Sequence, residues 1–158
     1  MPSRAVPHAS KMAAIYDTTY ERRDDMPKIT HIALKVDGLD ALEKFYHEVF
    51  GFEVVGRSRS EDRSRAAVTD GDINLTFLKY DSEDADMAQA VGEGPAIHHF
   101  AIEVDDVASY VPLLEQYGCE LLSPRTAIPV KFRMPGGGPI AELLPTGAFK
   151  GGVDRRAR

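Results

Sequence analysis

The feature that most constrains the fold of this chain is an internal repeat. Residues 29–37 and 97–105 align at a constant offset of 68 and are identical at five of nine positions. Both segments follow the pattern Ile-x-His-x-Ala-x-x-Val-Asp, and both alternate in the manner of a β-strand. A repeat of this kind within 158 residues indicates that the same structural unit occurs twice.

The segments that follow each copy also agree in kind. Each strand precedes an amphipathic helical stretch, which ends at Gly51 in the first copy and at Gly118 in the second. A last strand at 73–75 matches one at 141–143, again at an offset of 68. This order predicts an α+β fold made of two β-α-β-β-β modules.

The domain boundaries follow from the repeat, and the acidic, glycine-ended stretch 81–96 is predicted to link the modules. The expected parts are an N-terminal extension at 1–26, a domain at 27–148 with modules at 28–80 and 97–147, and a C-terminal tail at 149–158.

Composition excludes several classes of protein. The single cysteine excludes an internal disulfide and a cysteine-rich zinc site. The net charge of −6 argues against generic binding to nucleic acid or to anionic membranes. No run approaches the roughly 18 apolar residues of a membrane span, and residues 1–26 lack the apolar core of a signal peptide. We therefore expect a cytoplasmic protein whose partner is a small molecule.

Strand alternation predicts which side chains share the polar, concave face of the sheet. His31 lies on this face in the first copy, and His99 and Glu103 lie on it in the second. The last strands add Asn74 and Glu142 at equivalent positions of the repeat. Thr76 follows Asn74 on the same face.

Two imidazoles and a carboxylate that converge on one point form a two-histidine, one-carboxylate site for Fe, Mn, Co, Ni or Zn. If a pseudo-twofold axis relates the copies, His31, His99 and Glu142 converge in this way, with Asn74 as a possible fourth ligand. His98 is not a candidate ligand, because strict alternation places its side chain on the opposite face of the strand from that of His99.

Basic residues suggest an anionic substrate. Lys131 and Arg133 share one face of a strand and would bind a carboxylate or phosphate if that face lines the cavity. The alternative is a solvated edge strand with both charges outward. Arg57, Arg59 and two further arginines crowd a turn at 57–65 that reads as a solvated loop, although a phosphate-bearing carrier could dock there.

The paired His-x-Ala strands, the repeat and the segment Pro-Gly-Gly-Gly-Pro-Ile-Ala-Glu-Leu at 135–143 resemble the vicinal oxygen chelate superfamily. The resemblance covers about residues 28–147 and implies a half-open barrel with a metal inside. The four ligand positions of that family fall on His31, Asn74, His99 and Glu142. Asn74 departs from the glutamate or glutamine found there in glyoxalase I and methylmalonyl-CoA epimerase.

The resemblance implies a homodimeric lyase or isomerase of glyoxalase or epimerase type, acting on a small anionic substrate through a metal-bound enediolate. Glu142 and Glu103 are the candidate catalytic bases, and Lys131, Arg133 and Thr76 are the candidate substrate contacts.

Three alternatives stay open: an extradiol-type ring-cleaving dioxygenase, a thiol transferase like the fosfomycin-resistance enzymes, and a small-molecule binding or resistance protein. Against the dioxygenase, Lys131 occupies the position of that group's tyrosine, and no histidine follows residue 100. Against a pure binding protein, bleomycin-resistance proteins lack the ligands that are present here.

Overall fold

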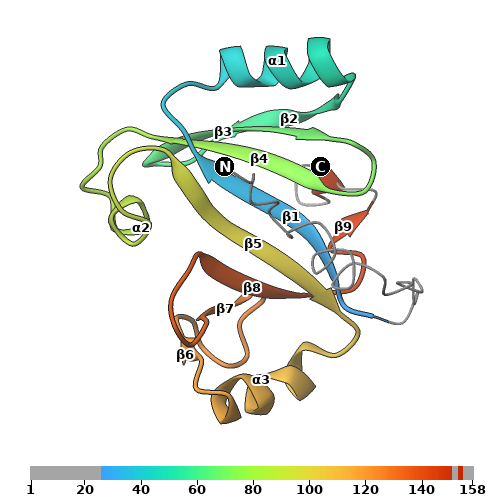
Figure 1. Ribbon diagram of the computed structural model, residues 1–158, viewed down its shortest axis with the longest axis vertical. Helices are drawn as coiled ribbons and strands as arrows, with labels where there is room; N and C mark the ends of the chain where they lie inside the picture. Colours follow the sequence, from blue (N-terminus) through green and yellow to red (C-terminus); the bar gives the residue numbers. More distant parts are fainter. Residues whose placement is uncertain (1–25, 151–152, 155–158) are drawn as a thin grey trace, which may run out of the picture.

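The computed structural model describes residues 26–150 and 153–154, and its first half forms one β-α-β-β-β module (Figure 1). The module consists of β1 (Lys28–Lys35), α1 (Asp40–Phe50), β2 (Glu53–Arg59), β3 (Arg63–Thr69) and β4 (Asn74–Tyr80).

The second half repeats this order and confirms the predicted pair of modules. It consists of β5 (Ala96–Val104), α3 (Val107–Gln116), β6 (Glu120–Leu121), β7 (Val130–Arg133) and β8 (Ile140–Pro145). Outside the modules lie a short helix in the linker, α2 (Asp86–Gln89), and a two-stranded hairpin, β9 (Phe149–Lys150) with β10 (Val153–Asp154). None of the helices in the described part of the chain is long and apolar enough to cross a membrane.

The two modules join in one eight-stranded sheet with the order β2-β3-β4-β1-β5-β8-β7-β6. At its centre β1 and β5 run antiparallel, and each has the last strand of its own module, β4 or β8, beside it in parallel. The sheet is not closed, since β2 and β6 form its two edges. Helices α1 and α3 lie at opposite ends of the molecule, each beside its own module (Figure 1).

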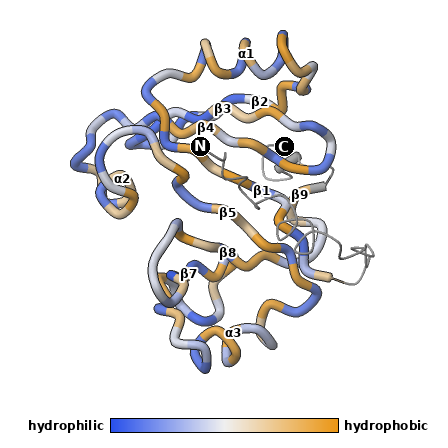
Figure 2. The backbone as a smooth tube through the Cα atoms, in the orientation of Figure 1, coloured by the Kyte–Doolittle hydropathy of each residue, from blue (hydrophilic) through white to orange (hydrophobic). Residues whose placement is uncertain are grey.

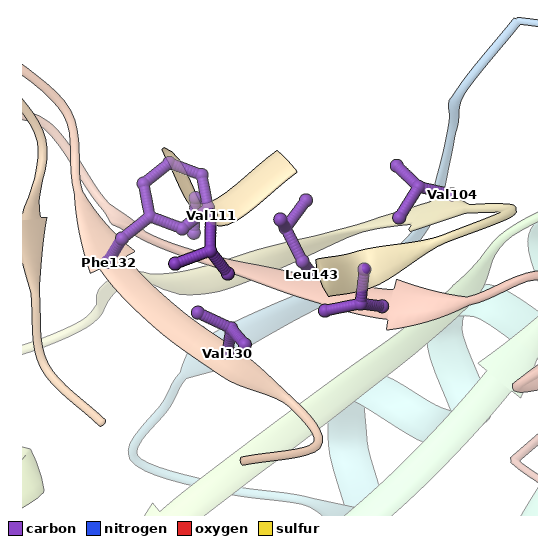
Figure 3. Packing of buried hydrophobic residues seen from close by; sticks show 7 residues of the cluster. Val104, Val111, Val130, Phe132 and Leu143 are labelled. Atoms are coloured by element: carbon purple, nitrogen blue, oxygen red, sulfur yellow. The ribbon is translucent and has the colours of Figure 1, made fainter. Parts of the chain in front are cut away.

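Each module packs its helix against its half of the sheet around a separate apolar core. In the second module, Val111 of α3 packs with Phe132 and Leu143 from the strands (Figure 3). In the first module, Phe77 of β4 lies at the centre of the corresponding cluster, with Tyr46 of α1 against it. Apolar residues therefore mark both helices as well as the strands (Figure 2). Burial on the helix side leaves the opposite, concave face of the sheet for polar side chains.

The C-terminal boundary predicted at residue 148 is too early. Phe149, assigned to the tail by the sequence, is only 6% exposed and packs with Ala101 and Leu144 on the concave face. Its ring also stacks on His31, with ring centroids 4.7 Å apart and planes 5° from parallel. A large apolar ring against a buried imidazole is a packing contact that a solvated tail would not make.

Candidate metal centre

Three adjacent strands bring the predicted ligands together. His31 of β1, His99 of β5 and Glu142 of β8 line one cavity of about 330 Å³ on the concave face. His31 and Glu142 are buried, and the His99 side chain is 14% exposed. Because β1, β5 and β8 are neighbours only through sheet pairing, residues far apart in the sequence meet here.

The three groups have the donor chemistry of a metal site. Nε2 of His31 lies 3.1 Å from Nε2 of His99, and that atom lies 3.8 Å from Oε2 of Glu142. Two ligands bound to one ion at about 2.1 Å lie at most about 4.2 Å apart, so both separations fit. No three His, Cys, Asp or Glu side chains among residues 26–150 and 153–154 are gathered as a complete metal site. The donor types and separations therefore fit a divalent ion, but the site is not fully assembled.

Asn74 occupies a different place from the fourth-ligand position proposed for it. Its Oδ1 lies 2.8 Å from Nδ1 of His31, on the far side of the ring from Nε2. The same oxygen accepts a hydrogen bond of 2.7 Å from the hydroxyl of Thr76. A carbonyl oxygen can only accept, so this contact places a proton of His31 on Nδ1, and in the neutral ring Nε2 then has a lone pair available. Asn74 thus orients a candidate ligand.

The two modules differ in how their last strands are registered. His31 pairs directly with Asn74 between β1 and β4, whereas Glu142 pairs with Ala101 between β5 and β8. The shift of two residues keeps Glu142 on the concave face, because side chains alternate with a period of two. The longer glutamate side chain then reaches along the sheet towards His99, while the shorter asparagine contacts His31, its direct neighbour on β1.

His98 lies in the cavity, contrary to the prediction from alternation. Between β1 and β5, Ala33 pairs with His99 but Leu34 pairs with Ile97, so His98 is the extra residue of a β-bulge. A bulge places two successive side chains opposite one residue and breaks the strict alternation. His98 therefore lines the same cavity as His99, with their Nδ1 atoms 2.7 Å apart. Thr30, its equivalent in the repeat, lies at a second register shift.

Burial keeps His98 and His99 neutral. Desolvation, with smaller effects from nearby cations, lowers the pKa of His98 to about 4. Desolvation and the neighbouring His31 and His98 lower the pKa of His99 to about 2. Burial also raises the pKa of Tyr80, whose hydroxyl lies 2.8 Å from Nε2 of His98. At neutral pH these groups therefore exchange hydrogen bonds as uncharged rings and a protonated phenol.

The lowered pKa of His98 predicts that the metal-free protein loses stability in mild acid. Below about pH 6.5 the unfolded chain takes up a proton on His98 that the folded chain does not bind, so unfolding becomes more favourable as the pH falls towards 4. Between pH 6.5 and 5, wild type should lose about 2 kcal/mol more than His98→Gln. Urea unfolding in the presence of a chelator measures the difference, and equal losses in the two proteins would contradict it.

Cationic side chains also line the cavity. Lys131, opposite Glu142 in the β7–β8 pair, has its Nζ 3.7 Å from Oε1 of that carboxylate. Arg63 and Arg65 of β3 also line the cavity. Arg65 donates to the hydroxyl of Thr76 over 3.4 Å, which occupies the group proposed as a substrate contact. Among the residues that the structure describes, the wall thus carries three cations and one carboxylate, and it favours a negatively charged ligand.

Two arginines, Arg133 and Arg65, lie in other surroundings than the sequence indicated. Arg133 lies outside the cavity and donates to the carbonyl of Ala90 in the linker, so it is not paired with Lys131 on a substrate. In the turn predicted to be solvated, Arg57 and Arg59 fit that prediction, since they form exposed ion pairs with nearby carboxylates. Arg65, which the same prediction included, faces the cavity instead.

Glu103, predicted as a catalytic base, lies outside the cavity of His31 and His99. Its carboxylate accepts hydrogen bonds from the backbone N–H groups of Gly147, at 2.9 Å, and Phe149, at 2.6 Å. It lies on the predicted face of β5, but the turn after β8 covers it and separates it from the cavity of His31 and His99. Its role is to hold that turn in place, and alternation could not reveal this because the turn covers the sheet from outside.

A family model described as the glyoxalase/bleomycin resistance protein/dioxygenase superfamily matches residues 28–134. The chain belongs to this superfamily. The match covers both modules up to the end of β7, and the fold is the one expected from the sequence resemblance. A search among curated protein sequences found no significant match.

Solved structures of the superfamily fold support this assignment. A variant of methylmalonyl-CoA epimerase from Streptomyces coelicolor, in complex with 2-nitronate-propionyl-CoA, is 25% identical, with a TM-score of 0.59 over 77% of this chain and 98% of that one. The epimerase from Mycobacterium tuberculosis is 21% identical, with a TM-score of 0.58 over 75% and 87%. A variant of 4-hydroxymandelate synthase from Streptomyces coelicolor is 21% identical, with a TM-score of 0.65 over 76% of this chain but 38% of the synthase.

Proposed function

We propose that this chain is a metal-dependent isomerase or lyase of the glyoxalase/bleomycin resistance protein/dioxygenase superfamily that acts on a small anionic substrate. One observation carries the proposal: two imidazole nitrogens and the carboxylate of Glu142 lie together in a cavity whose other charged groups, among residues 26–150, are cations. The epimerases among the similar structures support the reaction class. The donor set supports a resident divalent ion.

His31, His99 and Glu142 would hold the ion, which would supply Lewis-acid stabilisation of negative charge on a substrate oxygen. Glu142 has a second function available, because Oε2 faces His99 while Oε1 faces Lys131. The carboxylate can therefore accept a proton from a carbon next to a carbonyl at one oxygen and return it from the same position. Lys131 and Arg65 would neutralise the anionic group of the substrate and orient it.

Proton exchange with solvent tests this proposal most directly. The protein, loaded in turn with Co, Ni, Zn, Mn or Fe(II), is incubated in D₂O with a panel of 2-substituted malonyl thioesters and thiol adducts of 2-oxoaldehydes. We expect deuterium at the carbon next to the carbonyl of at least one compound, and Glu142→Gln should abolish its incorporation.

The alternatives give different results in the same series. Dioxygen uptake on catechols with the iron-loaded protein would replace the proposal with ring cleavage. Addition of a thiol to an epoxide would replace it with a transferase. Affinity for a panel member with no chemical change would indicate a binding protein.

A further inference from the structure

A continuous chain of hydrogen bonds runs through the candidate ligands to the cavity wall. From the Oδ1 of Asn74 it passes to Nδ1 of His31 at 2.8 Å, and from Nε2 of His31 to Nε2 of His99 at 3.1 Å. It continues from Nδ1 of His99 to Nδ1 of His98 at 2.7 Å, and ends with Nε2 of His98 and the hydroxyl of Tyr80 at 2.8 Å. Every ring nitrogen of the three histidines takes part.

The direction of this chain is determined at the Asn74 end. A carbonyl oxygen only accepts, so His31 donates from Nδ1, and a neutral His31 ring then accepts at Nε2. His99 consequently donates from Nε2 and accepts at Nδ1, where His98 donates to it. The remaining nitrogen of His98 accepts, and the hydroxyl of Tyr80 is its donor. Each neutral group makes one consistent choice.

This arrangement prepares His31 for metal binding but not His99. With all three rings neutral, this assignment leaves a lone pair on Nε2 of His31 and a proton on Nε2 of His99. We propose that His98 and Tyr80 form a reversible hydrogen-bond relay that sets the tautomer of His99, and that the relay reverses when a divalent ion binds at Nε2. This inference rests on the proposed function, because the reversal requires that His99 is a ligand.

The reversal conserves protons. In the reversed state His99 donates from Nδ1 to His98, and His98 donates from Nε2 to the oxygen of Tyr80. Each imidazole loses one N–H and gains the other, so no net proton enters or leaves the rings. Tyr80 suits the end of the relay, because a hydroxyl can donate in one state and accept in the other. Its hydroxyl also borders the cavity, where its own proton can turn to solvent.

The two candidate ligands are therefore controlled differently. Asn74 allows only one tautomer of His31, while His98 allows either tautomer of His99. The difference arises at equivalent positions of the repeat, where His98 corresponds to Thr30 and both lie at register shifts between β1 and β5. His98 and Tyr80 are positioning residues, since they act on the metal through His99.

Long-range ¹H–¹⁵N NMR spectra, which distinguish the two imidazole tautomers, test the relay in the unmodified protein. Without metal we expect His99 to carry its proton on Nε2 and His98 on Nδ1. With Zn(II) we expect His99 to carry it on Nδ1 and His98 on Nε2, with His31 unchanged at Nδ1. A proton on Nδ1 of His99 in the metal-free protein, or no change in His98 with zinc, would overturn the relay.

Zinc affinity, measured by competition with a chelator, provides the second readout. His98→Leu removes the acceptor for His99 and should weaken zinc binding about 10–100-fold, as loss of a partner behind a ligating histidine does. His98→Gln retains an acceptor and should recover most of the loss. Tyr80→Phe should weaken binding less, because solvent in the cavity can replace the hydroxyl.

His47→Gln is the matched control, since this exposed histidine bonds only to the carbonyl of Phe52 outside the cavity. Equal zinc affinity in wild type and His98→Leu would overturn the relay and leave the proposed function intact. Failure of wild type to bind any of the five divalent ions would overturn the proposed function and the reversal together.

Discussion

Each of the three single variants His31→Ala, His99→Ala and Glu142→Ala should abolish tight binding of a divalent metal while the sheet stays folded. The expected loss exceeds the roughly 10–100-fold effect of changes behind a ligand, because a direct bond to the ion disappears. The fold should persist because the two apolar cores lie on the other face of the sheet. Metal analysis after dialysis, together with circular dichroism, measures both effects.

The variant Asn74→Ala tests whether Asn74 orients His31 or binds the metal itself. Its oxygen contacts Nδ1 of His31, so we expect a loss of about 10–100-fold, smaller than the loss from His31→Ala. His47→Ala should leave the metal content unchanged. Unchanged metal content in any two of the His31, His99 and Glu142 variants would refute the assignment of the site, and a loss from Asn74→Ala as large as theirs would make Asn74 a ligand.

Arg65→Ala and Lys131→Ala should each weaken the binding of an anionic substrate about 10–100-fold and spare the metal content. Hydrogen bonds to charged groups contribute about 1.5–3 kcal/mol, which corresponds to this range. Arg65 should have the larger effect, because a guanidinium can bind a carboxylate through two donors. The Michaelis constant of a substrate from the panel, or competitive inhibition by malonate, measures the change.

Arg59→Ala is the matched control for charge, because Arg59 pairs with Asp81 at the surface. It should alter the Michaelis constant little. Arg133→Ala should also affect substrate binding less than Arg65→Ala, since Arg133 donates to the linker carbonyl of Ala90 and does not line the cavity of His31 and His99. An effect of Arg59→Ala equal to that of Arg65→Ala would mean that general charge, and not a cavity contact, attracts the anion.

Much of the fold could be predicted because its information is local and repeated. The offset of 68 between His31 and His99 is sufficient to expect two equivalent modules, and period-two alternation then places Glu142 and Asn74 on the concave face. The sequence also predicts the helix end at Gly51, and in the structure this glycine has a φ of 71°, in the left-handed region. The family match to residues 28–134 agrees with these patterns.

The contacts within the site could not be predicted in the same way. The bulge at His98 comes from pairing between two strands whose matching residues lie 68 positions apart, and nothing in the local pattern marks it. Arg65 and Arg133 look equivalent as basic residues on alternating strands, but Arg65 lines the cavity whereas Arg133 donates to the carbonyl of Ala90 in the linker.

The sequence by itself determined the two modules, the face of the sheet that carries polar side chains, and the candidate donors His31, His99 and Glu142. Only the tertiary structure decided that Asn74 supports His31, that His98 joins the cavity, and that the turn at Gly147 covers Glu103. The physical reason is that alternation specifies a face within one strand. Register, bulges and covering turns depend on which distant segments pair, and they decide which atoms on that face touch.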